Sequence, residues 1–188
     1  MSIHLLVVGE HYPNDAQISS VWRNAVETGT FKKLQCKSPN EVVKKVRGAA
    51  LSSQVIDTLD FFDHATPGCV RMGNDILFMH DGTGRLIARA LRPLLTTHAR
   101  VRLLGCETAQ GSEGQQLLSM LSEEFGDSVV VYGTIAPTES DDHFDSDGFK
   151  RSAEEFLLFS AAEAAKQLAP DFPTRLHERL SWYAVNGS

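Results

Sequence analysis

Cysteine is scarce in this chain, and its few residues follow no metal-binding or disulfide pattern. Cys36, Cys69 and Cys106 cannot form a closed disulfide set, because one of three must stay unpaired. None belongs to a C-x-x-C pair, which argues against structural zinc and thioredoxin-type redox chemistry. Free thiols suit a reducing compartment, so the sequence predicts a cytoplasmic protein.

Long hydrophobic runs and an excess of positive charge are also missing. No segment approaches the roughly 20 apolar residues that span a bilayer, and the amino terminus lacks the basic and apolar parts of a signal peptide. The 18 Lys and Arg residues are outnumbered by 24 Asp and Glu residues, for a net charge of −6. That balance argues against a surface that coats nucleic acid. We therefore expect neither a membrane nor a nucleic-acid partner.

The composition that remains is that of an ordinary globular domain. Of the 188 residues, 42% are hydrophobic and 22% are charged, which excludes disordered, collagen-like and low-complexity proteins. The length and the lack of an internal repeat predict a single domain over residues 1–188.

Apolar runs alternate with amphipathic stretches along the chain. We predict strands at residues 3–8, 31–36, 56–62, 101–104 and 129–132, a hairpin at 69–79, a last long helix at 152–168 and an edge strand at 180–185. Helical spacing of apolar residues recurs between successive strands. This alternation predicts an α/β fold, a three-layer αβα sandwich with a mainly parallel sheet.

Two reactive side chains come directly after neighbouring strands of this scheme. His64 follows the strand at 56–62, and Cys106 follows the strand at 101–104. Right-handed crossovers bring the carboxyl ends of parallel strands to one edge of the sheet, where ligands bind. We therefore expect the imidazole and the thiol to share a crevice. A thiol attacks as the thiolate, and an imidazole within reach accepts its proton and later protonates a departing amine.

The same two loops supply candidate oxyanion donors, the backbone N–H groups of Ala65 and Cys106. A structural interpretation stays open, because a free cysteine often only packs in a core and a histidine at a strand end often only holds a turn. Other reaction classes lose support, since the chain has no G-x-S-x-G elbow, no P-loop and no G-x-G-x-x-G after its first strand.

An acidic loop follows the strand at 129–132. Asp141, Asp142 and Asp145 lie in this loop, which we expect at the same sheet edge as the histidine and the cysteine. Carboxylates there would select a basic side chain of a substrate, as acidic specificity pockets do. The loop predicts cleavage after Arg or Lys.

The acidic loop also partly matches an EF-hand. Counted from His143, acidic residues fall at positions three and five, Gly148 at six and Glu154 at twelve. Position one is His rather than Asp, and position eight is Lys150 where an apolar residue is usual. A solvated loop is the simpler interpretation, and we predict no metal site.

The segments around the histidine and the cysteine resemble two signatures of the caspase-like (clan CD) superfamily. Residues 56–73, IDTLDFFDHATPGCVRMG, are similar to the hydrophobic strand, His-Gly-Ser-Pro-Gly motif and hairpin of a bacterial caspase-like domain of unknown function. Residues 101–115, VRLLGCETAQGSEGQ, look like its second signature, in which a strand ends in Gly-Cys and a Gly-x-x-Gly segment opens a helix. The resemblance covers about residues 50–135.

This resemblance implies a caspase-like sheet and a cysteine endopeptidase with Cys106 as nucleophile, His64 as base and no cofactor. The chain departs from the pattern at Ala65, where the superfamily usually has Gly; alanine still offers its N–H but restricts the backbone. Glu-Thr-Ala after Cys106 replaces the Arg-Gly of caspases, so their aspartate specificity does not carry over.

Two other functions remain open. Because some relatives are inactive, one alternative is a catalytically silent module that binds a protein or peptide at the same crevice. A small-molecule hydrolase or sensor is another. The sequence does not determine the oligomeric state.

Overall fold

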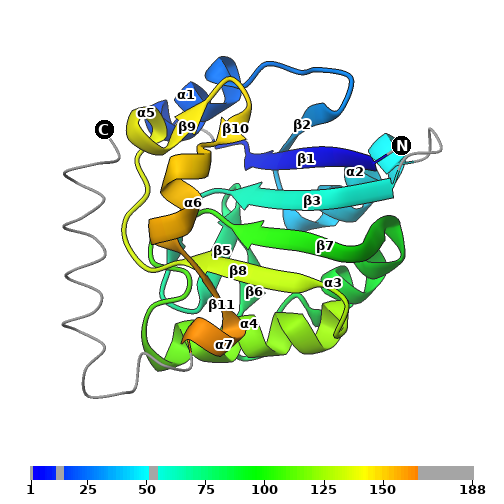
Figure 1. Ribbon diagram of the computed structural model, residues 1–188, viewed down its shortest axis with the longest axis vertical. Coiled ribbons are helices and arrows are strands. Elements are labelled where there is room, and N and C mark those ends of the chain that lie inside the picture. Colours follow the sequence, from blue (N-terminus) through cyan, green and yellow to red (C-terminus); the bar gives the residue numbers. More distant parts are fainter. Residues whose placement is uncertain (1, 12–14, 51–54, 165–188) are drawn as a thin grey trace.

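A six-stranded sheet forms the centre of the molecule. The structure, a computed structural model, describes residues 2–11, 15–50 and 55–164. The strand order is β11-β8-β7-β3-β1-β2, and every neighbouring pair is parallel except β11 with β8 (Figure 1). The strands are β1 (Ser2–Gly9), β2 (Phe31–Cys36), β3 (Val55–Phe62), β7 (Leu95–Leu103), β8 (Val130–Thr134) and β11 (Leu158–Ser160). The predicted α/β class and mainly parallel sheet are confirmed.

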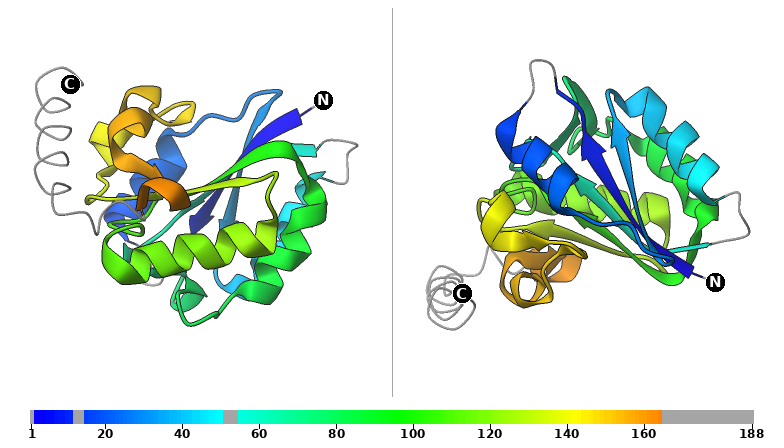
Figure 2. Two further views of the ribbon diagram at one scale, coloured as in Figure 1. Left: turned by 60° about the horizontal axis from the view of Figure 1, so that its bottom comes forward. Right: turned by 90° about the horizontal axis from the view of Figure 1, so that it is seen from above.

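Helices cover both faces of this sheet. On one side lie α1 (Ala16–Asn24) and α6 (Arg151–Leu157), and on the other lie α2 (Pro39–Ala50), α3 (Arg85–Leu91) and α4 (Gly111–Phe125), as Figure 2 shows. Strand β1 contributes to both cores, because Leu5 and Val7 pack on one face while Leu6 and Val8 pack on the other. A strand buried on both faces has a continuous apolar sequence, as residues 3–8 do.

Smaller elements surround the sheet. They are the hairpin strands β4 (Ala65–Thr66), β5 (Cys69–Met72) and β6 (Asp75–Met79), the 3₁₀ turn η1 (Arg92–Leu94), helix α5 (Ser140–His143), strands β9 (Phe144–Asp145) and β10 (Gly148–Phe149), and helix α7 (Ala161–Ala164). The predicted hairpin at 69–79 is present, with β4 as a third strand. No helix in the described part of the chain is long and apolar enough to cross a membrane.

The fourth core strand is longer than predicted. Strand β7 begins at Leu95, six residues before the predicted start, and Leu95 pairs with Ile56 of β3. Its first half carries Thr96, Thr97 and the exposed His98. A half-exposed strand of this kind lacks the apolar run that marked residues 101–104, although threonine favours strands.

The predicted helix at 152–168 is wrong in its middle. Helix α6 ends at Leu157, and the next three residues form β11, which pairs antiparallel with β8. Leu158 packs in the core on one face of the sheet and Phe159 in the core on the other, which is the alternation of a strand. Residues 165–168 and the predicted edge strand at 180–185 lie outside the described residues.

Candidate active site

The loops after β3 and β7 leave the sheet at one edge. Phe61 of β3 pairs with Leu103 of β7, and the N–H of Leu104 donates to Phe61 O at 2.8 Å. His64 and Cys106 each lie three residues beyond that pair. The structure therefore places both residues at the carboxyl edge, toward which the arrows of β3 and β7 point in Figure 1.

Gly105 lets these two loops touch. A β carbon built on Gly105 would lie 2.4 Å from Ala65 Cβ and 2.6 Å from Asp63 O. Both distances are far below van der Waals contact, so any side chain at position 105 would push the loops apart. The glycine before the cysteine thus has a steric function at the site.

Asp63 anchors the start of the His64 loop. Its buried carboxylate accepts hydrogen bonds from His11 Nε2 at 2.5 Å, from the N–H of His64 at 2.6 Å and from the N–H of Gly73 at 2.6 Å. The backbone N–H of His64 is therefore fixed, while its imidazole stays available to other partners.

The imidazole of His64 contacts the first turn of α1. Its Nε2 lies 3.0 Å from Asp15 Oδ2, and its side chain is 46% exposed. The ring of His11 meets it edge-on, with 5.1 Å between ring centroids. When Nε2 carries the hydrogen that is donated to Asp15, Nδ1 of the neutral ring is an acceptor.

The thiol of Cys106 is half-buried beside Thr138. Cys106 Sγ lies 3.9 Å from both the carbonyl oxygen and Oγ1 of Thr138, whose hydroxyl donates to Leu104 O at 2.9 Å. Gln17 Nε2 donates to Thr138 O at 2.6 Å. The start of α1 therefore contacts both His64, through Asp15, and Thr138, which lies beside the thiol of Cys106.

No hydrogen bond joins His64 to Cys106 in the described contacts. The imidazole is bonded to Asp15, and the sulfur contacts Thr138. Hydrogen bonds between catalytic groups are often long or absent before substrate binds. In the described contacts the two groups therefore lie at one edge, each with its own partner.

Ala65 presents its N–H away from the hairpin. The N–H of Arg71 donates to His64 O at 3.0 Å, so His64 and Arg71 form a hydrogen-bonded pair at the start of the β4–β5 ladder. The next pair, Ala65 with Val70, is then a non-hydrogen-bonded pair whose N–H groups point outward. A β carbon on Gly105 would lie 3.4 Å from Ala65 N. The nitrogen of the candidate oxyanion donor thus lies close to the loop that carries the cysteine.

The backbone turns sharply after Cys106. Glu107 has a φ of 57°, in the left-handed region, and its N–H donates to Ala136 O. The next N–H, of Thr108, donates to Thr134 Oγ1. Strained backbone of this kind is found most often at functional sites. The N–H of Cys106, the other predicted oxyanion donor, precedes these bonded groups.

The carboxylates of the acidic loop belong to different elements of the fold. Asp142 is exposed in α5, four residues along the chain from Thr138, and the side chain of Asp141 is outside the described part of the structure. Asp145 is exposed in β9 and pairs with Gly148, which lies against Phe31 and His4 at the starts of β2 and β1. Asp145 therefore lies in a hairpin that runs from Phe62, at the end of β3, where Phe144 packs, toward the starts of β1 and β2.

The contacts of the acidic loop do not support the EF-hand alternative. Glu154, its twelfth position, is bound by Arg102 and Arg100. The Nδ1 of His143, its first position, accepts the N–H of Glu139 at 2.9 Å, and burial lowers the pKa of this histidine. Among the described residues, no group of three or more His, Cys, Asp or Glu side chains is arranged to hold a metal ion.

The other two thiols lie in different surroundings. Cys36 is buried at the end of β2, and burial raises its pKa to about 11. Burial also raises the pKa of Cys69, in the hairpin. Both groups are therefore poor nucleophiles near neutral pH, because only the thiolate reacts.

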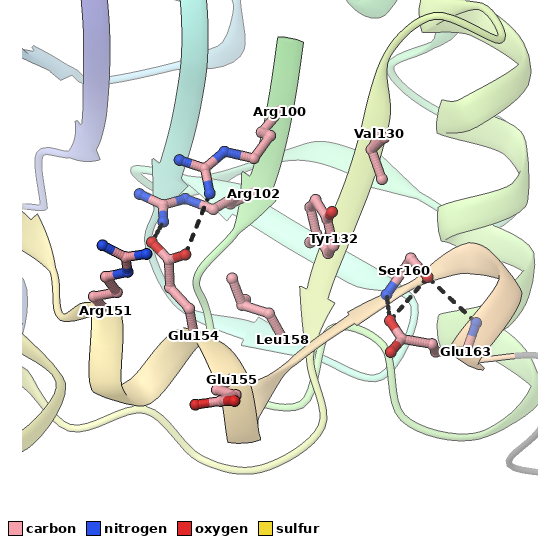
Figure 3. A pocket seen from close by; sticks show the side chains of 10 residues that line it. All are labelled: Arg100, Arg102, Val130, Tyr132, Arg151, Glu154, Glu155, Leu158, Ser160 and Glu163. Carbon is pink, nitrogen blue, oxygen red and sulfur yellow. Dashed lines mark hydrogen bonds and ion pairs between the residues drawn. The ribbon is translucent and has the colours of Figure 1, made fainter. Parts of the chain in front are cut away.

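A second polar cluster lies under α6. The buried Arg102 donates to Asp60 through Nε at 2.6 Å and through Nη2 at 2.5 Å, and it also binds Glu154. His4 Nε2 lies 2.6 Å from Asp60 Oδ2. A cavity of about 530 Å³ opens beside this cluster, over the face of β7, β8 and β11 (Figure 3). Its two most buried charges are paired with each other, so we assign the cluster a structural role.

Sequence reasoning missed His11 and Asp15. Both follow β1, so the rule that drew attention to His64 and Cys106 also applies to them. His11 comes two residues after Gly9, the last residue of the strand, and its position was the available signal. Asp15 marks the start of α1, but its reach to His64 depends on how that helix packs.

The comparisons with known proteins identify a family without assigning an activity. Residues 18–134 match the family described as "Domain of unknown function (DUF4347)", a stretch that contains both His64 and Cys106 and covers more than half of the chain. Searches of curated proteins and of solved structures gave no significant match. The chain therefore belongs to the DUF4347 family.

Proposed function

We propose that this chain is a caspase-like cysteine endopeptidase, with Cys106 as nucleophile and His64 as general base. The observation that carries the proposal is the contact between the loops after β3 and β7, which holds both side chains at one sheet edge. The resemblance of these loops to caspase-like signatures supports the same function.

The reaction would follow thiol peptidase chemistry. His64 takes the proton of Cys106, the sulfur bonds to the carbonyl carbon, and the oxyanion is met by the N–H groups of Ala65 and Cys106. His64 then protonates the amine as the C–N bond breaks. Water hydrolyses the thioester and restores the thiol. These steps use only side chains and backbone groups of the chain together with water.

The substrate would be a protein or peptide cleaved after Arg or Lys. Asp142 is exposed and follows Thr138 by four residues in the chain, and the net charge of −6 suits a basic substrate. Cys36, Cys69 and Cys106 are all free thiols. We propose that the protein acts in a reducing compartment such as the cytoplasm, where a thiol nucleophile is maintained.

Selective alkylation tests the proposed nucleophile. Iodoacetamide at pH 6, read out by peptide mass spectrometry, is expected to modify Cys106 much faster than Cys36 or Cys69, because burial raises the pKa of both. His64→Ala should slow the modification of Cys106 itself, because the imidazole no longer accepts the proton of the thiol. In a casein digestion followed over time, His64→Ala is expected to lose about 10²- to 10⁴-fold in rate.

Cys106→Ala is the matched control for the casein assay and should abolish cleavage. Modification of Cys106 no faster than Cys69 in the wild type would contradict the proposal, as would casein cleavage that survives in Cys106→Ala.

A binding module without activity is the second candidate. It is favoured by one observation, the bond of His64 to Asp15 instead of to Cys106. Under this alternative a peptide binds at the same edge and stays intact, and Cys106→Ala binds it as tightly as the wild type.

A further inference from the structure

Asp15 uses its two carboxylate oxygens for two different contacts. Oδ1 accepts the N–H of Ile18 at 2.9 Å and so caps the amino terminus of α1, while Oδ2 lies 3.0 Å from Nε2 of His64. The helix-capping hydrogen bond, opposed by partial burial and helped by His64, lowers the pKa of Asp15. The group facing the imidazole is therefore a carboxylate at neutral pH.

This contact determines which nitrogen of His64 can act as a base. A carboxylate only accepts hydrogen bonds, so Nε2 must donate and must carry the hydrogen. In the neutral ring the lone pair is then on Nδ1. Once Nδ1 has taken a proton from a thiol, the same carboxylate lies beside an imidazolium and stabilises its charge.

The helix that begins after Asp15 also contacts the nucleophile's side of the site. Gln17, two residues along, donates to Thr138 O at 2.6 Å, and that oxygen lies 3.9 Å from Cys106 Sγ. The start of α1 therefore contacts His64 directly through Asp15. It contacts Cys106 indirectly, because Gln17 binds the carbonyl group of Thr138 beside the thiol.

Asp63, the other carboxylate near His64, does not do this. Its oxygens accept the backbone N–H groups of His64 and Gly73 and the ring of His11. It fixes the loop and leaves the imidazole of His64 unconstrained. Among the carboxylates in the described part of the site, Asp15 is the one bonded to that ring.

We propose that Asp15 is the positioning residue of the Cys106–His64 pair: it holds His64 in the Nε2–H tautomer with Nδ1 available to the thiol, and it stabilises the imidazolium after proton transfer. This role rests on the proposed function. No further group is required, because the proton moves from Sγ to Nδ1 and then to the leaving amine.

Asp15→Asn separates this role from helix capping. Asn caps helices as well as Asp does. Its single amide oxygen is needed by the N–H of Ile18, so its NH₂ group faces His64 and donates to Nε2. The variant is expected to keep its fold, to change His64 to the Nδ1–H tautomer in ¹⁵N NMR spectra, and to lose roughly 10- to 100-fold in kcat with little change in KM.

Two further variants control the experiment. Asp15→Ser also caps α1 but does not reach the imidazole, so it should lose kcat while unfolding at the denaturant concentration of the wild type. Asp127→Asn removes one negative charge at the opposite edge, before β8, from an exposed side chain, and should leave both the tautomer and kcat unchanged.

The outcomes distinguish this inference from the proposed function. An active wild type whose Asp15→Asn and Asp15→Ser variants keep the wild-type kcat and tautomer overturns the role of Asp15 alone. A wild type that neither cleaves casein nor shows selective alkylation of Cys106 overturns the peptidase and the role of Asp15 with it. Loss of kcat in both variants, with the altered tautomer in Asp15→Asn, supports both.

Discussion

Asp142 and Asp145 are three residues apart and have the same charge, yet they lie at different places in the molecule. Asp142 lies in α5, four residues along the chain from Thr138, whereas Asp145 lies in β9, whose partner Gly148 packs against the starts of β1 and β2. Strands β9 and β10 form a hairpin over the sheet, with Phe144 and Phe149 buried, and Asp145 lies in its first strand. Carboxylates close in sequence can therefore belong to different structural elements.

Substitution of these two residues tests the substrate preference. Among peptides ending in Arg, Lys, Asp or Leu at the cleaved bond, we expect the wild type to prefer Arg and Lys. An exposed charge near a bound cation contributes about 1 kcal/mol, so Asp142→Asn should reduce kcat/KM for the basic peptides about fivefold at low salt.

Asp145→Asn is the matched control, with the same loss of charge in the same loop and no expected effect. A wild-type preference for the peptide ending in Asp would contradict basic specificity. Equal losses in the two variants would show that net charge, and not position, determines the preference.

At the scale of elements, a buried ion-pair cluster joins β1, β3, β7 and α6. Burial alone would raise the pKa of Asp60, but the charges and hydrogen bonds of Arg102 and His4 together outweigh it and hold this pKa well below its usual range. Glu154 of α6 binds the same Arg102 (Figure 3). Removing one partner of such a buried pair costs about 3–5 kcal/mol, since the other charge is left uncompensated.

The depressed pKa of Asp60 predicts how stability depends on pH. In the folded protein Asp60 stays ionised at pH 3, whereas in the unfolded chain, with an ordinary pKa near 4, it is largely protonated. The unfolded state then binds more protons, so acid favours unfolding. As the pH falls from 5 to 3, protonation of Asp60 in the unfolded state should lower the free energy of unfolding of the wild type by about 1 kcal/mol.

Urea unfolding at several pH values measures this contribution. Asp60→Asn should be less stable at pH 7 and should lack this part of the acid dependence. Asp57→Asn, on the same strand but partly exposed, should keep the wild-type slope of unfolding free energy against pH. A slope in Asp60→Asn equal to that of the wild type would mean that Asp60 does not titrate as the structure requires.

The predicted helix at 152–168 shows where the local sequence pattern is insufficient to predict secondary structure. Residues 152–164 have apolar side chains at spacings that suit a helix, and the break at β11 arises because Leu158 and Phe159 extend the sheet beside β8. A local signal was present, since the N–H of Ser160 donates to Glu163 Oε2 and the N–H of Glu163 donates to Ser160 Oγ, a capping box that starts α7. The edge strand itself depends on a partner distant in sequence.

At the scale of the whole molecule, the site follows from the topology of a parallel sheet. Alternating strands and helices were enough to place His64 and Cys106 at one edge, because that placement needs only strand order and direction. The contacts of those residues could not be predicted the same way. Asp15 reaches His64 and Gln17 reaches Thr138 only through the packing of α1 on the sheet, which involves many weakly patterned residues.

Gly105 is the position at which this topology can be tested most directly. Gly105→Ala would place a methyl group 2.4 Å from Ala65 Cβ and 2.6 Å from Asp63 O. We expect a loss of about 1–3 kcal/mol in unfolding free energy from overpacking. Because the loops after β3 and β7 must separate, alkylation of Cys106 by iodoacetamide should also slow, to the rate seen in His64→Ala.

Gly48→Ala is the matched control for that substitution. It makes the same chemical change in α2, where an added β carbon meets nothing within 4 Å, so it should leave alkylation unchanged and stabilise the helix by up to about 1 kcal/mol. If Gly105→Ala has the unfolding free energy and the Cys106 alkylation rate of the wild type, the two loops are not in contact. The shared sheet edge on which the proposed chemistry depends is then not present. If it loses stability but keeps its reactivity, the contact supports the fold and the approach of His64 to Cys106 does not depend on it.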